Sequence, residues 1–122
     1  MHPDWIEHRR GADGELLGWM EPAEGGFVVI DLLGRPRSDA LDWLAAEETL
    51  DALGIGYLGE PHELRLDTGE WIRVRITEAS PRGIRVKQDD WGAQAVGSPQ
   101  VFFTVEFPAP AHLRPIMRGT AR

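Results

Sequence analysis

The stretch that decides the fold runs from His62 to Gln88 and reads HELRLDTGEWIRVRITEASPRGIRVKQ. Its polar and apolar residues alternate with a period of two, which is typical of strands with one buried and one exposed face. Asp67–Gly69 matches a three-residue hairpin loop whose glycine adopts the left-handed conformation. A second turn at residues 78–83 contains proline and glycine. The stretch therefore predicts three consecutive antiparallel strands.

The hairpin loop also fixes the register of the first two strands. It places Leu64 opposite Ile72, Glu63 opposite Arg73 and Arg65 opposite Trp71. One set of side chains is then expected to face the core: Ile72, Val74, Ile76, Ile84 and Val86. The alternate set is expected to face outward: Trp71, Arg73, Arg75, Thr77, Arg85 and Lys87.

A helix is predicted over about residues 39–53. Ser38 or Asp39 offers an N-cap, and Gly54 is a natural residue to end the helix. One apolar stripe consists of Trp43, Ala46, Leu50 and Leu53. A second set lies roughly opposite and consists of Leu41, Leu44, Ala45 and Ala52. We therefore expect the helix to be covered on both sides, by its own sheet and by a second element or a second subunit.

Further strands are predicted at residues 5–10, 15–20, 27–33 and 101–107. The 27–33 segment is apolar on both faces, which favours a central strand. Residues 108–122 contain several prolines and are interpreted as a C-terminal tail laid over the surface or partly disordered. The sum predicts one α+β domain over residues 1–122. Its mostly antiparallel, strongly bent sheet or small β-barrel has about seven strands, and the one main helix packs on it.

Composition limits the class of protein. The 122 residues are 42% hydrophobic, carry a net charge of −7 and include no cysteine, which removes disulfides and thiolate metal sites. The first ten residues contain no apolar run, so we expect no signal peptide. The longest apolar stretch, GGFVVIDLLG, is too short to span a bilayer. These features predict a soluble cytoplasmic protein with no membrane association.

Two segments carry a resemblance to known sequences: LDWLAAEETLDALGIGYL, and WIRVRITEASPRGIRVKQDDWG further along. Together they resemble a group of small uncharacterised proteins of high-GC, actinobacterial-type bacteria. The resemblance covers most of residues 15–115. It contains no catalytic motif, and it implies no activity, cofactor or partner.

The candidate ligand-binding residues lie on the outward face of the hairpin region. Five basic residues and one acidic residue fall between Arg73 and Lys87, although the whole chain is acidic. The candidate set is Trp71, Arg73, Arg75, Arg85 and Lys87. In the alternative interpretation this is an ordinary solvated face. Glu63 would then pair with Arg73, Arg65 would stack on Trp71, and the acidic helix would neutralise the rest.

Catalytic and metal-binding motifs give no comparable signal. The four histidines show no metal-ligand spacing, and no nucleophile motif or phosphate-binding loop is present. Asp89 and Asp90 are interpreted as part of a turn with Trp91 and Gly92. We therefore predict no catalytic residue, no metal and no cofactor. The alternative is a small enzyme of unrecognised type, with a cleft lined by His62 or by Asp89 and Asp90.

The function expected from these patterns is a small binding or adaptor module. Its Arg/Trp face on residues 71–88 would contact an acidic partner, either a protein segment or a second copy of this chain in a homodimer. Nucleic acid is the weaker alternative, because the overall negative charge opposes binding to a polyanion.

Overall fold

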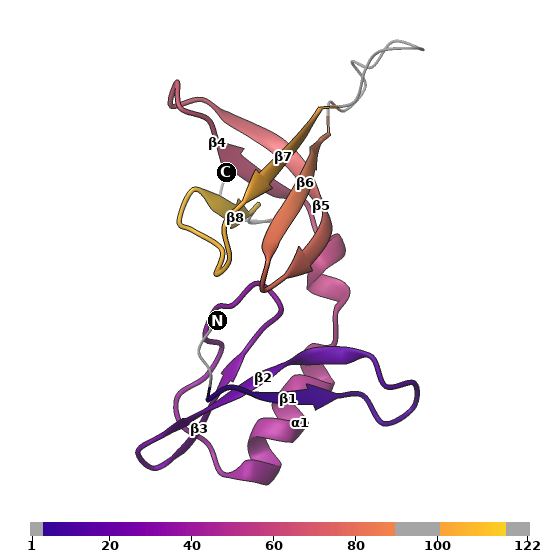
Figure 1. The fold of residues 1–122 in the computed structure, drawn as a ribbon, viewed down its shortest axis with the longest axis vertical. Helices are drawn as coiled ribbons and strands as arrows, with labels where there is room; N and C mark the ends of the chain where they lie inside the picture. The colour runs from indigo at the N-terminus through magenta and orange to yellow at the C-terminus, as the bar shows by residue number, and fades with distance from the viewer. Residues whose placement is uncertain (1–3, 90–100, 117–122) are drawn as a thin grey trace. The chain divides into compact units, whose positions relative to one another are not determined.

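The computed structural model describes residues 4–89 and 101–116. The chain forms two compact units, Met1–Tyr57 and Leu58–Arg122 (Figure 1). The described residues form one α-helix and eight strands, so the α+β class is confirmed. The strands make two antiparallel sheets of three and five strands instead of one bent sheet, and these residues form no closed barrel.

The first unit contains the three-stranded sheet, in the order β1-β2-β3. Its strands are β1 (Ile6–Arg9), β2 (Leu16–Ala23) and β3 (Gly26–Ile30). The prediction of a central strand at 27–33 was wrong, because β3 ends at Ile30 and β2 is central. A neighbouring segment covers the outer edge of β3. Phe27 and Leu41 exchange two backbone hydrogen bonds there, of 2.7 and 2.8 Å.

Helix α1 (Trp43–Leu53) begins four residues later than predicted. Leu41 is held in an extended bridge to β3, so the helix starts only after it. Asp42 is the N-cap in place of Ser38 or Asp39, and its Oδ1 accepts a 2.8 Å hydrogen bond from the Ala45 N–H. The predicted end at Gly54 is confirmed: its φ is 61° and its N–H donates to the Leu50 carbonyl.

The core of the first unit lies between α1 and its sheet (Figure 1). Fully buried Leu17, Met20, Val29, Ala46 and Leu50 form it. Gly18 permits the close approach: an added Cβ would meet the Ile30 carbonyl oxygen and lie 2.9 Å from Leu50 Cδ2. On the other side of the helix Leu44 is 62% exposed. The prediction that a second element of this chain covers that side was therefore wrong for the described residues. The alternative, that a second subunit covers it, stays a prediction.

The second unit contains the five-stranded sheet, in the order β7-β6-β5-β4-β8. Its strands are β4 (His62–Arg65), β5 (Trp71–Ser80), β6 (Gly83–Gln88), β7 (Phe102–Val105) and β8 (Leu113–Pro115), and a short 3₁₀ turn, η1 (Gly56–Gly59), precedes them. The predicted hairpin register is confirmed at all three positions. Gly69 has a φ of 92°, as its place in the loop requires.

Two features of this sheet differ from the predictions. A bulge between Ile76 and Glu78 shifts the register, so that Glu78 lies opposite Arg85. Part of the predicted tail forms β8, which pairs antiparallel with β4 and buries Leu113 fully. The buried side chains of the unit come from all five strands, with Leu64, Val74, Ile84, Val86, Val105 and Leu113 the apolar ones.

Candidate functional site: a basic face on the second sheet

Strands β5 and β6 place four basic side chains on one face of the second sheet. Val74 and Val86 are fully buried, so the residues that alternate with them point away from the core. Arg73, Arg75 and Arg85 are exposed, and Lys87 is partly exposed. The predicted outward orientation is confirmed. We call the side chains of Arg73, Arg75, Arg85 and Lys87 the basic face.

The register brings like charges together on the basic face. Arg75 lies directly opposite Lys87 on the neighbouring strand, an arrangement that destabilises a sheet. Arg85 lies opposite Glu78, and its guanidinium carbon is 4.8 Å from the centre of the Phe102 ring on β7. The described residues offer neither Arg85 nor Lys87 a carboxylate at ion-pair distance. The face therefore keeps a surplus of positive charge.

One carboxylate, that of Asp89, enters the basic face. Its Oδ2 is 3.3 Å from Arg75 Nη2 and 3.7 Å from Arg73 Nε. Its backbone N–H donates to the Arg73 carbonyl at 2.9 Å and so extends the β5–β6 pairing. Asp89 thus neutralises part of the positive charge of the basic face. Asp90, Trp91 and Gly92 lie outside the described residues.

Trp71 lies between two arginines at one end of β5. The predicted stacking partner Arg65 is 5.7 Å from the ring centre. Arg114 of β8 is closer, at 3.7 Å, and no sequence pattern predicted this contact. Arg114 also takes the place of Arg73 as the ion-pair partner of Glu63, with Nε and Oε1 2.6 Å apart. The Trp71 ring is therefore used in contacts within the sheet, which leaves little of it for a stacked base.

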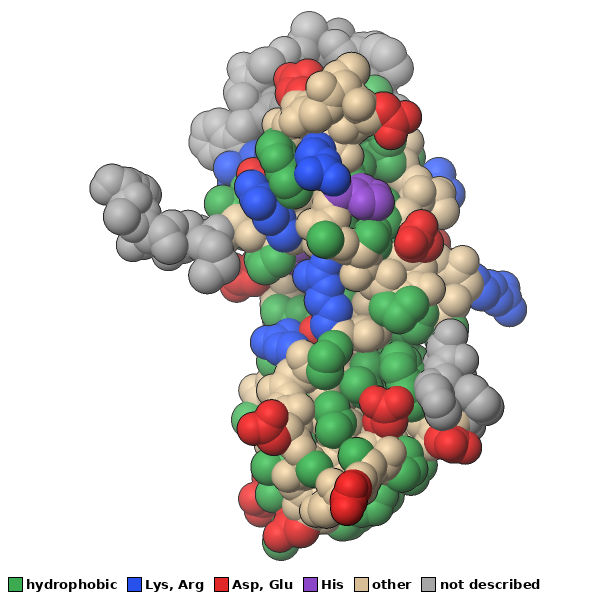
Figure 2. All heavy atoms as spheres, turned by 90° about the vertical axis from the view of Figure 1, so that its left-hand side faces the viewer, with side chains coloured by type: hydrophobic (Ala, Val, Ile, Leu, Met, Phe, Trp, Pro, Cys, Tyr) green, Lys and Arg blue, Asp and Glu red, His purple; other side chains and the backbone are tan. Residues whose placement is uncertain are grey.

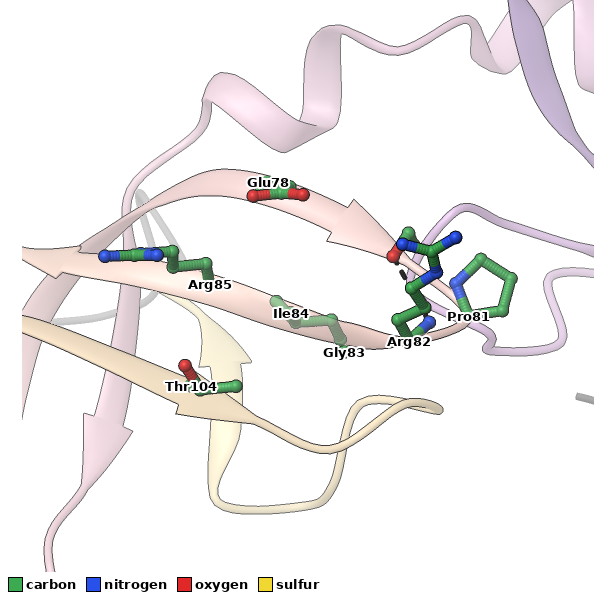
Figure 3. A pocket seen from close by; sticks show the side chains of 8 residues that line it. Glu78, Pro81, Arg82, Gly83, Ile84, Arg85 and Thr104 are labelled. Atoms are coloured by element: carbon green, nitrogen blue, oxygen red, sulfur yellow. Dashed lines mark hydrogen bonds between the residues drawn. The ribbon is translucent and has the colours of Figure 1, made fainter.

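A hollow of about 550 Å³ lies beside the basic face at the turn between β5 and β6. Figure 3 shows Arg85 at one end of it and Arg82 and Pro81 at the other, with Glu78 and Ile84 between them. Thr104 of β7 contributes to its wall. The hollow combines two guanidinium groups with one carboxylate, which suits an anionic group better than a cationic one.

His62 and Asp89, each of which could line a cleft in the alternative enzyme hypothesis, lie on opposite faces of the second sheet. His62 is 2% exposed, and its Nδ1 is 2.8 Å from the Glu60 carbonyl oxygen. It lies opposite buried Val74 on the inner face of the sheet, whereas Asp89 contacts arginines on the outer face. A cleft lined by His62 and a cleft lined by Asp89 would therefore be two separate sites. Within residues 4–89 and 101–116, no cluster of three or more His, Asp or Glu could hold a metal ion.

The first unit holds a separate polar cluster around Asp31, which the sequence analysis missed. The carboxylate is 1% exposed, and its Oδ1 accepts from the backbone N–H groups of Leu33 and Arg35 at 2.9 and 3.0 Å. Its Oδ2 accepts from Arg37 Nη1 at 2.8 Å. The segment DLLGRPR reads only as the end of a strand and a turn, so nothing local marks Asp31 as buried. These contacts close the loop after β3, which is a structural role.

Tyr57 completes this cluster. Its hydroxyl oxygen accepts a 2.8 Å hydrogen bond from the Leu32 N–H, and Arg37 lies 5.3 Å from its ring centre. Burial raises the pKa of Tyr57 to about 12. Burial also lowers the pKa of Arg35. The hydroxyl stays protonated at neutral pH, and no activated nucleophile results.

Comparison of the chain with models of protein families, with curated proteins and with solved structures gives no match. Within the described residues, no helix has the length and apolar character needed to cross a membrane.

Proposed function

We propose that the protein is a small binding module whose basic face contacts an acidic protein segment. The observation that carries this proposal is the direct opposition of Arg75 and Lys87 on exposed, neighbouring strands. Such opposition costs stability in the free protein, and an anionic partner would relieve it. Asp89 offsets two of the arginines, but Arg85 and Lys87 keep their charge available.

The composition of the two units supports a selective role for this face. Residues 1–57 contain twelve acidic and four basic residues, whereas residues 58–122 contain eight and nine. On the side of the molecule drawn in Figure 2, acidic side chains gather over the first unit. A chain with a net charge of −7 repels long polyanions, so a short acidic segment is a better partner than nucleic acid.

A homodimer is the second candidate, and the same charge distribution favours it. The acidic first unit of one copy offers the chemistry that the basic face of another copy would bind. Sedimentation equilibrium across a salt series separates the two candidates. A dimer that dissociates as salt rises supports self-association, whereas a monomer at all salt concentrations leaves the face to a different protein.

The proposal is tested by fluorescence anisotropy with a labelled acidic peptide and a labelled single-stranded RNA. We expect the peptide to bind, and the affinity to fall as salt rises. Arg75→Glu combined with Arg85→Glu should weaken the peptide complex by more than about tenfold. Arg9→Glu combined with Arg10→Glu is the matched control, because it changes the net charge equally on exposed side chains of the first unit.

Two results would overturn the proposal. One is equal peptide affinity of the two double variants, which would show that net charge and not the basic face controls binding. The other is tight RNA binding without peptide binding, which would assign the face to nucleic acid.

A further inference from the structure

We propose that the acidic segment binds as an added antiparallel strand along the outer edge of β7, next to the basic face. This inference rests on the proposed function and specifies how the partner is held. Strand β7 ends the five-stranded sheet, with β6 on one side of it. Added strands are a recurrent way of binding extended peptides, in which backbone hydrogen bonds supply affinity and side chains supply selectivity.

The hydrogen-bond phase of β7 is fixed by its pairing with β6. The Gln88 N–H donates to the Val101 carbonyl at 2.8 Å. Because bonded and non-bonded pairs alternate in an antiparallel ladder, Phe103 and Val105 also bond to β6, opposite Val86 and Ile84. The N–H and C=O groups of Phe102 and Thr104 therefore point outward. Among the described residues, no backbone hydrogen bond to these outward groups is made.

The side chains at this edge fit an extended acidic segment. Phe102 lies opposite Lys87 and Thr104 lies opposite Arg85, so all four share the outer face. A strand added to β7 would lie about 10 Å from β6, two strand spacings away. The long side chains of Arg85 and Lys87 can extend toward carboxylates at that distance. Phe102, at 42% exposed, and Val101, at 43%, provide apolar area for the same segment.

The other edge of the sheet is a poorer site for an added strand. Strand β8 has three residues, and the last of them is Pro115. Proline lacks a backbone N–H, and it is one of the residues by which proteins block edge pairing. The edge of β3 in the first unit is already bonded to Leu41. Of these edges, β7 alone combines outward backbone groups with neighbouring positive charge.

Strand addition makes a specific prediction about the peptide backbone. The probe is a fluorescein-labelled peptide of about eight residues in which Glu and Val alternate, a usual strand length. In an antiparallel bonded pair the two residues exchange both hydrogen bonds, and their side chains lie on the same face. The Glu side chains would face Arg85 and Lys87. The backbone N–H groups of the same Glu residues would therefore donate hydrogen bonds to the outward carbonyl groups of β7. Methylation of the Glu nitrogens should weaken binding by about tenfold or more, and methylation of the Val nitrogens should change it by less than about threefold.

A variant of the protein tests the same contact from the other side. Thr104→Pro removes one outward N–H without removing a bond to β6, so the sheet should keep its fold. We expect it to weaken binding by about tenfold, and by clearly more than Thr104→Ala, which shortens the same side chain but keeps the backbone N–H. The methylated peptides use the unaltered protein, so they decide the question even if Thr104→Pro does not fold.

The outcomes separate the strand from the function. Loss of binding with methylated Glu but not methylated Val supports strand addition. Equal binding of both methylated peptides, still weakened by Arg75→Glu with Arg85→Glu, overturns strand addition and leaves the proposed function standing. Peptide binding that is unchanged by Arg75→Glu with Arg85→Glu, or no peptide binding even at low salt, overturns both strand addition and the proposed function.

Discussion

The two units use their charged residues differently. In the first unit the buried carboxylate of Asp31 accepts backbone and Arg37 hydrogen bonds, so its charge holds a loop in place. In the second unit the buried side chains are almost all apolar, while the arginines lie outside, against Asp89, Phe102 and Trp71. The charge of Asp31 therefore contributes to stability in the first unit, whereas the arginines of the second unit are exposed, and we propose that they bind a partner. Substitutions can test that division.

The largest effect is expected from Gly18→Ala in the first unit. Gly18 has a φ of 153°, and an added Cβ would collide with the Ile30 carbonyl and crowd Leu50. We expect a loss of about 3–5 kcal/mol in the free energy of unfolding, measured by urea denaturation. Gly11→Ala is the control, because nothing lies within 4 Å of the added carbon. A Gly18→Ala protein as stable as this control would contradict the close packing of α1 on β2.

The two sides of α1 should differ in cost. Leu50 is fully buried, so Leu50→Ala should lower the free energy of unfolding by about 2–5 kcal/mol. Leu44 is 62% exposed, so Leu44→Ala should lower it by less than about 0.5 kcal/mol. Thermal denaturation of both variants at several protein concentrations checks this. If Leu44→Ala instead lowers stability strongly, and the loss grows with protein concentration, a second subunit covers that side of the helix.

Tyr57 should make the first unit sensitive to alkaline pH. Because burial raises its pKa to about 12 in the folded chain, the folded state favours the protonated hydroxyl. Its contribution is complete below about pH 10 and is lost as pH rises toward about 12. We expect the free energy of unfolding to fall by about 1–2 kcal/mol over that interval. The Tyr57→Phe protein should have a lower free energy of unfolding at neutral pH and should not lose stability between about pH 10 and about pH 12. An identical loss in this variant would show that other groups cause it.

The smallest effect on stability is expected at the basic face. Arg75→Glu with Arg85→Glu turns the repulsion between residues 75 and 87 into an attraction. It also removes the ion pair with Asp89 and places new carboxylates beside Asp89 and opposite Glu78. Most of these side chains are exposed, so each change is small and the changes partly offset one another. The free energy of unfolding should therefore change by less than about 0.5 kcal/mol, measured by urea denaturation. A loss above about 2 kcal/mol would show that these arginines stabilise the sheet. The proposed difference between the charged residues of the two units would then be wrong.

Local patterns in the sequence predicted local structure well. The loop Asp67–Gly69 determined the register of β4 with β5, and Gly54 determined the end of α1, because each depends on a few adjacent residues. The start of α1 depends on a bridge between Leu41 and Phe27, which no neighbouring residue announces. The separation into two sheets also depends on pairings between distant segments.

The same distinction applies to the candidate site. The outward direction of Arg73, Arg75, Arg85 and Lys87 follows from alternation, and the sequence predicted it. The contacts of Arg114 with Trp71 and Glu63 depend on β8 returning to β4 across about fifty residues. The position of Asp89 between two arginines depends on the β5–β6 register beyond the bulge. No short motif encodes either arrangement.

The return of β8 to β4 has a consequence for the order in which the chain acquires structure during synthesis. The first unit ends at Tyr57, whose hydroxyl accepts a hydrogen bond from the Leu32 N–H, so the contacts within this unit need no later part of the chain. The second unit begins with β4, whose outer partner is not made until residues 113–115. Domains fold as units while the chain is being made. The acidic unit can therefore be folded on the ribosome while the edge of β4 still lacks its neighbour.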